Sequence, residues 1–145
     1  NFGRGLTREE VTTAAEYAQA LPFIENLTKG FDSEVAAMGT NFSGGQKQRM
    51  LISRALAAHP EILILDDSSS ALDYKTDASL RKALREHFTG TTSIIVAQRI
   101  SSIYQCDHVM VLEDGQCVGY GTHEELMENC EIYREIHESQ MRAEA

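Results

Sequence analysis

Residues Thr40 to Asp73 read T-N-F-S-G-G-Q-K-Q-R-M-L-I-S-R-A-L-A-A-H-P-E-I-L-I-L-D-D-S-S-S-A-L-D, and this stretch decides the fold. Within it, Ser43 and Gln46 have the spacing of a capping box, in which a hydroxyl and an amide satisfy free N–H groups at a helix start. The stretch therefore predicts a helix that begins near Ser43. The apolar residues of this helix recur at spacings of four, which predicts an inward stripe of Leu51, Ile52, Ala55 and Leu56.

Two glycines, Gly44 and Gly45, occupy the first turn of this predicted helix. Each glycine costs about 1 kcal/mol relative to alanine inside a helix, so capping alone does not explain them. The free amides and positive dipole of a helix N-terminus suit an anion, and missing side chains let phosphate oxygens approach the backbone. We therefore interpret the two glycines as a phosphate contact, with plain helix capping as the alternative.

A short apolar run, Ile62 to Leu65, follows Pro60 and has the length of a buried parallel strand. Asp66 and Asp67 stand at its carboxyl end, which is where open α/β sheets place their ligands. Carboxylates at this position can hold a magnesium ion that bridges nucleotide phosphates. A solvated acidic turn is the alternative, and it explains one carboxylate better than two.

These residues resemble three motifs of one protein family. Phe42 to Gln46 resembles the signature motif, LSGGQ, of the nucleotide-binding domain of ATP-binding-cassette (ABC) transporters, with Phe42 in place of the usual leucine. Ile62 to Asp66 resembles the Walker B strand of that domain, and Ser70 to Asp73 resembles its D-loop. The order and spacing of the motifs make the resemblance specific. It runs through essentially all 145 residues and covers only the later part of such a domain.

The resemblance implies an α/β fold, with a P-loop-NTPase-like, mostly parallel and incomplete sheet, flanking helices and an N-terminal helical subdomain. Residues 1–58 are expected to form the helical subdomain with the signature motif, and residues 59–145 the C-terminal part of the ATPase core. No G-x-x-x-x-G-K-S/T sequence is present, because none of the four lysines follows a glycine. The Walker A part is therefore expected to be absent, so that the isolated chain binds ATP poorly and is inactive.

The resemblance also implies roles for individual residues. Asp66 corresponds to the Walker B aspartate and is expected to hold Mg2+ together with the phosphates of ATP. Asp67 stands where the family has a catalytic glutamate, and a misplacement of about 1 Å can cost on the order of 10²-fold in rate. Gln98 stands at the switch histidine; it can donate a hydrogen bond to a γ-phosphate but cannot carry the charge of an imidazolium. Together, the two replacements predict a weakened catalytic site.

The signature residues are expected to act on ATP held by another chain, because this family sandwiches each nucleotide between two domains. The residues expected to contact that nucleotide are Phe42, Ser43, Gly44, Gly45, Gln46 and Asp73. A weakened site at Asp67 beside an intact signature favours a heterodimer, whose second nucleotide-binding domain belongs to a different subunit. A homodimer in which Asp67 works as a slow base at two equal sites stays open.

The resemblance implies that the complete protein is an ATP hydrolase that powers an ABC exporter, with a transmembrane domain in the same chain. These residues would then lie at the cytoplasmic face of the cell membrane, with ATP and Mg2+ as cofactors. Q-K-Q-R after the signature, the acidic balance and G-T-H-E-E-L at Gly121 to Leu126 favour an exporter over a soluble ABC-type ATPase of the chromosome or repair class. A regulatory subunit that binds ATP without hydrolysing it is a third hypothesis, which Asp67 and Gln98 keep open.

Composition argues against several other classes of function. The net charge of -9 opposes nucleic acid as a partner, since phosphate backbones bind basic surfaces. No run approaches the roughly 18 consecutive apolar residues of a membrane span. Cys106, Cys117 and Cys130 are odd in number and lack C-x-x-C spacing, which disfavours a disulfide framework and a zinc site. The five histidines form no H-x-x-x-H pair, so no metal is assigned to them.

Residue patterns outside the central stretch predict the remaining elements. Thr7 to Glu10 is a second capping box, which starts a helix that runs to about Ala20 and is stopped by Pro22. A helix is expected over residues 76–87 and a second buried strand over 92–97. The patterns that follow predict a hairpin of residues 107–112 and 116–120, a helix capped by Thr122 and a last helix over 132–140.

Overall fold

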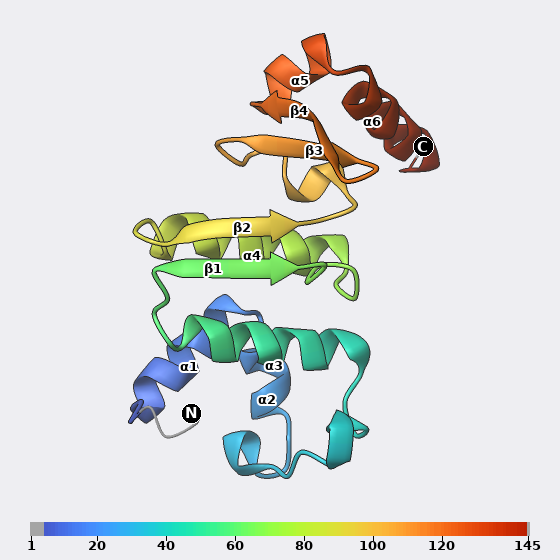
Figure 1. Cartoon of the computed structure of the whole chain (residues 1–145). Coiled ribbons are helices and arrows are strands. Elements are labelled where there is room, and N and C mark those ends of the chain that lie inside the picture. The colour runs from blue at the N-terminus through green and yellow to red at the C-terminus, as the bar shows by residue number, and fades with distance from the viewer. Residues whose placement is uncertain (1–4, 145) are drawn as a thin grey trace. The chain divides into compact units, whose positions relative to one another are not determined.

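The computed structural model describes residues 5–144. They belong to two compact units, which divide between Val96 and Ala97. The first unit is coloured from blue to yellow in Figure 1, and the second from orange to red. The predicted division into a helical subdomain of residues 1–58 and a part of the ATPase core of residues 59–145 stays a prediction.

The first unit consists, over its described residues, of helices and a pair of parallel strands. In chain order, its elements are α1 (Arg8–Tyr17), α2 (Leu21–Glu25), the 3-10 turns η1 (Gly30–Asp32) and η2 (Ala37–Gly39), α3 (Gly44–Leu56), β1 (Ile62–Asp66), α4 (Tyr74–His87) and β2 (Thr92–Val96). Strands β1 and β2 pair with Ile62 opposite Thr92 and Asp66 opposite Val96. Because α4 connects the two strands, they form a β-α-β unit, as parallel neighbours usually do. This arrangement confirms the predicted α/β fold.

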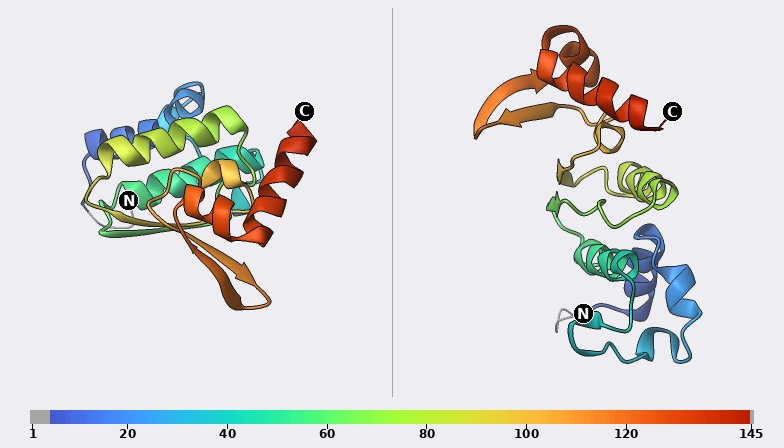
Figure 2. Two further views of the ribbon diagram at one scale, coloured as in Figure 1. Left: turned by 90° about the horizontal axis from the view of Figure 1, so that it is seen from above. Right: turned by 90° about the vertical axis from the view of Figure 1, so that its right-hand side faces the viewer.

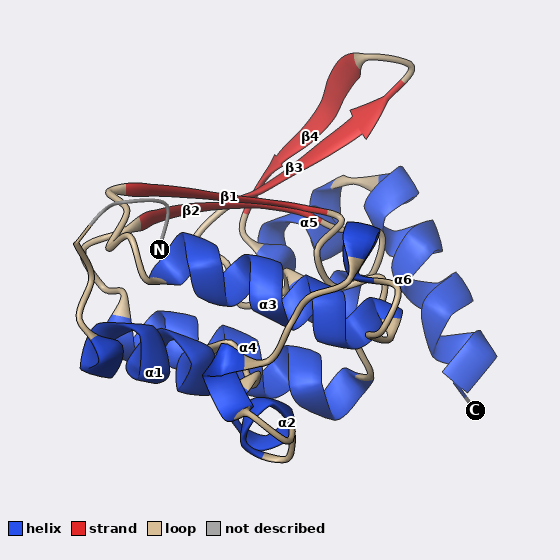
Figure 3. Cartoon of the chain, turned by 90° about the horizontal axis from the view of Figure 1, so that it is seen from below, coloured by secondary structure: helices blue, strands red, loops and turns tan. Residues whose placement is uncertain are grey.

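Helices α3 and α4 lie on the same side of the β1–β2 pair, as Figures 2 and 3 show. Leu63 and Leu65 of β1 are buried in one apolar cluster with side chains of these helices and of α1, among them Ala15, Leu56 and Leu80. Burying one such leucine side chain stabilises the fold by roughly 1.5–3 kcal/mol. The core of the first unit therefore lies between the strands and the helices.

The opposite face of the β1–β2 pair is exposed. Ile62 and Ile64 of β1 are 62% and 64% exposed, and Ile94 and Val96 of β2 are 49% and 52% exposed. The prediction of two buried strands is therefore wrong for this face, because the described residues place helices against the other face only. The exposed side chains agree with the expectation of an incomplete sheet.

Helix α1 ends at Tyr17 rather than near Ala20. Gln19 has a φ of 58°, which lies outside the right-handed helical region and ends the helix before the proline is reached. Pro22 lies instead in the first turn of α2, where its missing N–H needs no partner. Thus Pro22 belongs to the first turn of the second helix and does not stop the first.

Two details of α3 and α4 also differ from the predictions. In α3, Ile52 and Leu56 are buried as expected, whereas Leu51 is 47% exposed and does not belong to the inward stripe. Helix α4 begins at Tyr74, earlier than residue 76, because Asp73 caps it. Leu80 of α4 is buried as expected.

The second unit contains the predicted hairpin and the helices that follow it. Its elements are η3 (Ile100–Ser102), β3 (Val109–Glu113), β4 (Gln116–Gly121), α5 (His123–Asn129) and α6 (Glu131–Glu144). Asp114 and Gly115 join the antiparallel strands with φ values of 48° and 77°. Positive φ at both positions is what a two-residue turn of type I′ requires. The hairpin is confirmed, with strand ends shifted by one or two residues.

The helices are short. Helices α4 and α6 have 14 residues each, fewer than the roughly 20 that a membrane span needs. Over residues 5–144, no helix combines the length and the apolar character needed to cross a membrane.

Candidate functional site

The segment Phe42 to Gln46 starts α3 with the predicted capping box. The Ser43 Oγ accepts a hydrogen bond from the Gln46 N–H at 3.2 Å, and the Gln46 Oε1 accepts one from the Ser43 N–H at 2.9 Å. Phe42 is buried, and its ring centroid lies 6.3 Å from that of Phe23 in an edge-on arrangement. Ser43 is exposed, so its capping role leaves it accessible to a ligand.

The two glycines of this segment have different surroundings. A Cβ atom on Gly45 would lie 2.9 Å from the carbonyl oxygen of Ala71, closer than real Cβ atoms approach a backbone. A Cβ atom on Gly44 would meet only the Ala71 Cβ at 3.9 Å, which is an ordinary contact. Packing against Ala71 therefore explains Gly45, and no local sequence pattern predicts this contact. The phosphate interpretation now depends on Ser43 and Gly44, which are both exposed.

Asp66 is the last residue of β1, and Asp67 follows it directly. The Asp67 N–H donates a hydrogen bond to the Val96 carbonyl oxygen at 3.0 Å, and the Asp67 backbone has a φ of 45°. The N–H and the Oγ of Ser70 both donate to the Asp67 carbonyl oxygen, at 3.3 and 2.9 Å. These bonds fix the Asp67 backbone at the carboxyl end of the strand pair. Asp66 and Asp67 are both exposed at this end of the strand, where the sequence predicts them.

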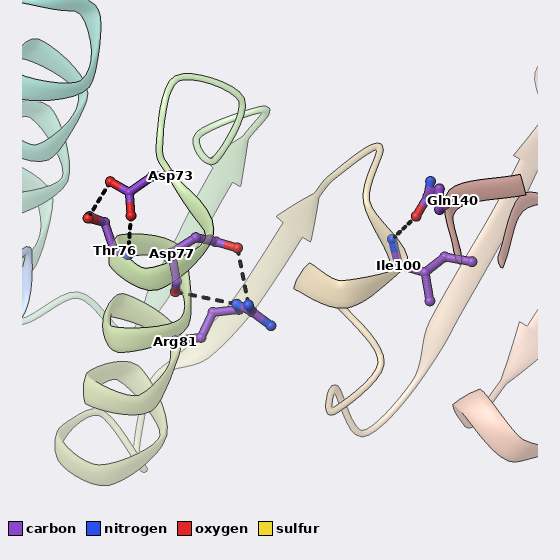
Figure 4. Close-up of polar contacts among 6 residues, drawn as sticks. All are labelled: Asp73, Thr76, Asp77, Arg81, Ile100 and Gln140. Carbon is purple, nitrogen blue, oxygen red and sulfur yellow. Dashed lines mark hydrogen bonds and ion pairs between the residues drawn. The ribbon is translucent and has the colours of Figure 1, made fainter. Parts of the chain in front are cut away.

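Asp73 is the N-cap of α4. Its Oδ1 accepts a hydrogen bond from the Thr76 N–H at 2.9 Å, and its Oδ2 accepts one from the Thr76 hydroxyl at 2.8 Å (Figure 4). Both bonds favour the ionised carboxylate and lower the pKa of Asp73 below its usual value. The bond from the Thr76 N–H has the larger effect, and the bond from the Thr76 hydroxyl has the next largest. Helix capping thus gives Asp73 a structural role, and its predicted contact with nucleotide stays a prediction.

One turn further along α4, a buried ion pair supports the helix. The Arg81 Nη2 lies 3.2 Å from the Asp77 Oδ2, and the two side chains are 13% and 3% exposed (Figure 4). The Arg81 Nε also donates to the Asp77 carbonyl oxygen at 3.4 Å. Asp77 belongs to none of the predicted motifs, so its sequence context did not indicate this ion pair.

Gln98 lies in the second unit, two residues before η3 begins, and is exposed. Its carbonyl oxygen accepts a hydrogen bond of 2.7 Å from the Gln140 Nε2. The Gln140 Oε1 accepts a hydrogen bond of 2.9 Å from the Ile100 N–H (Figure 4). Local patterns do not mark Gln140, because its two partners lie 42 and 40 residues away in the sequence.

The first unit thus brings two of the predicted motifs into contact, since Gly45 of the signature lies against Ala71 of the D-loop. Asp66 and Asp67 are neighbours at the strand end, and Gln98 belongs to the second unit. No cluster of three or more His, Cys, Asp or Glu side chains suited to a metal occurs within the part of the chain that the structure describes. A Mg2+ site at Asp66 would not need such a cluster, because this ion is commonly held by one or two carboxylates together with nucleotide phosphates.

Comparisons with known proteins give a consistent result. A sequence model of the family described as ABC transporter matches residues 3–70. The uncharacterized ABC transporter ATP-binding protein YknU of Bacillus subtilis (strain 168) is 43% identical over 143 residues, which cover 98% of this chain and 24% of that protein. The ATP-dependent lipid A-core flippase of Escherichia coli (strain K12) is 40% identical over 134 residues, which cover 92% of this chain and 23% of that protein.

A solved structure agrees with these relatives. The structure of a bacterial Atm1-family ABC exporter with ATP bound matches this fold with a TM-score of 0.91 and 37% sequence identity, over 97% of this chain and 25% of that chain. The chain therefore spans about a quarter of the length of these proteins. Motif order, fold and sequence similarity agree: this chain is similar to a part of the exporter-type ATP-binding domain of ABC transporters.

Proposed function

We propose that this chain is part of an ATP-hydrolysing subunit that powers an ABC exporter. The observation that carries the proposal is the match to the ATP-bound exporter structure over 97% of the chain. A soluble ABC-type ATPase of the chromosome or repair class is the alternative, and the transporter and flippase names of the relatives favour the exporter. The complete protein would carry a transmembrane domain in the same chain and hold its ATP-binding part at the cytoplasmic face of the cell membrane.

ATP and Mg2+ are the cofactors that this function requires. Asp66 would hold Mg2+ together with the phosphates, because it presents an exposed carboxylate at the end of β1. When bound, the ion neutralises charge on the phosphate oxygens. The net charge of -9 leaves this chain no general attraction for nucleic acid, so no nucleic acid is proposed as a partner.

The signature residues would act on ATP bound by a second nucleotide-binding domain. Ser43 and Gly44 are exposed at the N-terminus of α3, a helix of 13 residues whose dipole favours an anion there. Gly44 has no atom outside its own helix closer than 3.9 Å to the position of a Cβ, so a phosphate can approach the backbone. Phe42, Gly45, Gln46 and Asp73 would support this contact by fixing the two helix starts.

This chain would also contribute a weakened site of its own. The Asp67 backbone is fixed by the bond of its N–H to Val96 and by the bonds of its carbonyl to Ser70. It therefore cannot move forward to compensate for the methylene group by which aspartate is shorter than glutamate. Gln98 would contact the γ-phosphate as a neutral donor. A weakened site beside an intact signature favours a heterodimer, in which a different subunit supplies the fully active catalytic residues. A homodimer with two slow sites, or a regulatory subunit that binds ATP without hydrolysing it, is the alternative.

The signature assignment is tested by Ser43→Asp and Ser43→Asn in the complete protein. Asp, Asn and Ser are about equally good helix N-caps, so both variants keep the start of α3. A carboxylate at this position repels the γ-phosphate, whereas a neutral amide does not. We expect Ser43→Asp to abolish most ATP hydrolysis and Ser43→Asn to retain much more of it.

Thr40→Asp is the matched control, because it adds the same charge at an exposed position just before the signature. We expect this variant to keep near-normal ATP hydrolysis. If Ser43→Asp hydrolyses ATP as fast as Thr40→Asp does, Ser43 is a helix cap only and the signature assignment is wrong.

A further inference from the structure

We infer that Gln140 is a positioning residue for Gln98, which it holds through the main chain. The inference rests on the proposed role of Gln98 at the γ-phosphate, and it involves residues of the second unit alone. Gln140 lies on α6, far along the chain from the segment that it contacts (Figure 4). It would contact neither the nucleotide nor the attacking water, and would act only by fixing the backbone from which the Gln98 side chain extends.

The Gln140 side-chain amide makes hydrogen bonds to the backbone of the residues before and after Arg99. Its Nε2 donates to the Gln98 carbonyl at 2.7 Å, and its Oε1 accepts from the Ile100 N–H at 2.9 Å. Ile100 is the first residue of η3, whose N-cap makes no side-chain capping bond, so its N–H needs a partner from elsewhere. One side chain thereby satisfies a donor and an acceptor of the same short segment.

The position of Gln140 is itself fixed by the buried face of α6. Tyr133 is 2% exposed, and its Oη lies 2.9 Å from the His123 Nδ1 of α5. The ring centroid of His137 lies 5.7 Å from that of His123. Tyr133, His137 and Gln140 follow one another at spacings of four and three, which places them on one face of the helix. The packing of α6 on α5 therefore holds the Gln140 amide beside residues Gln98 to Ile100, the switch segment.

A fixed carbonyl at Gln98 fixes the peptide plane that follows it and narrows the directions open to the exposed Gln98 side chain. That matters for a residue that must reach a phosphate, since a displacement of about 1 Å can cost on the order of 10²-fold in rate. The competing interpretation is that Gln140 only docks α6 on η3. The docking role uses the Ile100 bond, whereas the positioning role requires the Gln98 bond.

Gln140→Glu separates the two roles. A carboxylate keeps an acceptor for the Ile100 N–H, loses the donor and places an oxygen against the Gln98 carbonyl. We expect the complete protein carrying this variant to lose its preference for ATP over ADP at this chain's site by about tenfold, as expected for one lost hydrogen bond to a charged group. The dissociation constant for ADP should not change, because ADP lacks the γ-phosphate.

Three further variants complete the experiment. Gln98→Ala should lose the same preference, and the double variant Gln98→Ala with Gln140→Glu should lose no more than Gln98→Ala alone, since both changes remove one interaction. Ser139→Glu is the matched control, because it adds the same charge at the neighbouring exposed residue of α6. This control should bind both nucleotides normally.

The outcomes distinguish the inference from the proposed function. If Gln98→Ala loses the ATP preference while Gln140→Glu keeps it, the positioning inference is wrong and the role of Gln98 stands. If Gln98→Ala keeps the preference, the proposed role of Gln98 is wrong. If Gln140→Glu weakens ADP binding as much as ATP binding, Gln140 serves the fold in general and does not position the switch segment.

Discussion

Gly45 lies so close to Ala71 that a Cβ atom at position 45 would stand 2.9 Å from the Ala71 carbonyl oxygen. The contact joins the first turn of α3 to the segment that leads into α4. Any side chain at position 45 must therefore move a backbone segment, and that segment is the predicted D-loop. The position of one motif thus depends on the absence of a side chain in another.

Substitution of each glycine by alanine should give opposite results. Gly45→Ala should lower the free energy of unfolding of the ATP-binding domain by about 1–3 kcal/mol, because an overpacked site must shift its backbone. Gly44→Ala should leave this free energy unchanged or raise it by up to about 1 kcal/mol, because alanine favours the helix. Denaturant unfolding measures both variants. Equal effects at the two positions would show that the contact with Ala71 does not constrain position 45.

The ion pair of Arg81 with Asp77 should matter far more than its exposed neighbour. Arg81→Met removes the cation beside a buried carboxylate and should lower the free energy of unfolding by about 3–5 kcal/mol. Lys82→Met is the matched control, since Lys82 lies 3.8 Å from Glu86 and both side chains are more than half exposed. It should change the free energy by about 0.5 kcal/mol or less. Similar losses from the two variants would contradict the burial of the Arg81 pair.

The cap at Asp73 should give the domain a measurable acid sensitivity. Its pKa in the folded state is lowered from 3.8, so its stabilising contribution is complete above that value and is lost as the pH falls through the lower, folded value. Asp73→Asn keeps a good cap without a titrating group. Unfolding measured at neutral pH should be nearly equal for the two proteins, and the variant should lose less stability on acidification. Parallel losses in both proteins would argue against the hydrogen-bonded carboxylate.

The 145 residues alone should not bind Mg-ATP with useful affinity. Their sequence contains no Walker A motif, whose lysine and backbone amides make the main triphosphate contacts. Titration calorimetry of the isolated chain with Mg-ATP tests this expectation. A micromolar dissociation constant would mean that Asp66, Ser43 and their neighbours bind nucleotide without that motif.

Sequence patterns predicted the parts of this fold that depend on local bonds. All three residues predicted to cap helices, Thr7, Ser43 and Thr122, accept a bond from the N–H three residues later. The turn at Asp114 and Gly115 likewise follows from two residues that tolerate positive φ. These features succeed because each is complete within a few neighbouring residues.

Features that depend on distant residues were not predictable in the same way. The exposure of Ile62 and Ile64 depends on which layers cover the sheet, and their apolar character alone suggested burial. The sequence suggested a phosphate contact for Gly45, because Ala71, its neighbour in space, is remote in sequence. Gln140 carried no local signal, since both of its partners lie in the switch segment.

Steady-state ATP hydrolysis by the complete protein carrying Asp67→Asn tests the asymmetric site most directly. If Asp67 belongs to a weakened site in a heterodimer, its loss should barely lower the rate, whereas replacing the catalytic glutamate of the other subunit should stop most of it. Asp67→Glu is the matched variant and should raise turnover at this chain's own site. Loss of nearly all hydrolysis on Asp67→Asn, in a chain that purifies as an active homodimer, would contradict the heterodimer.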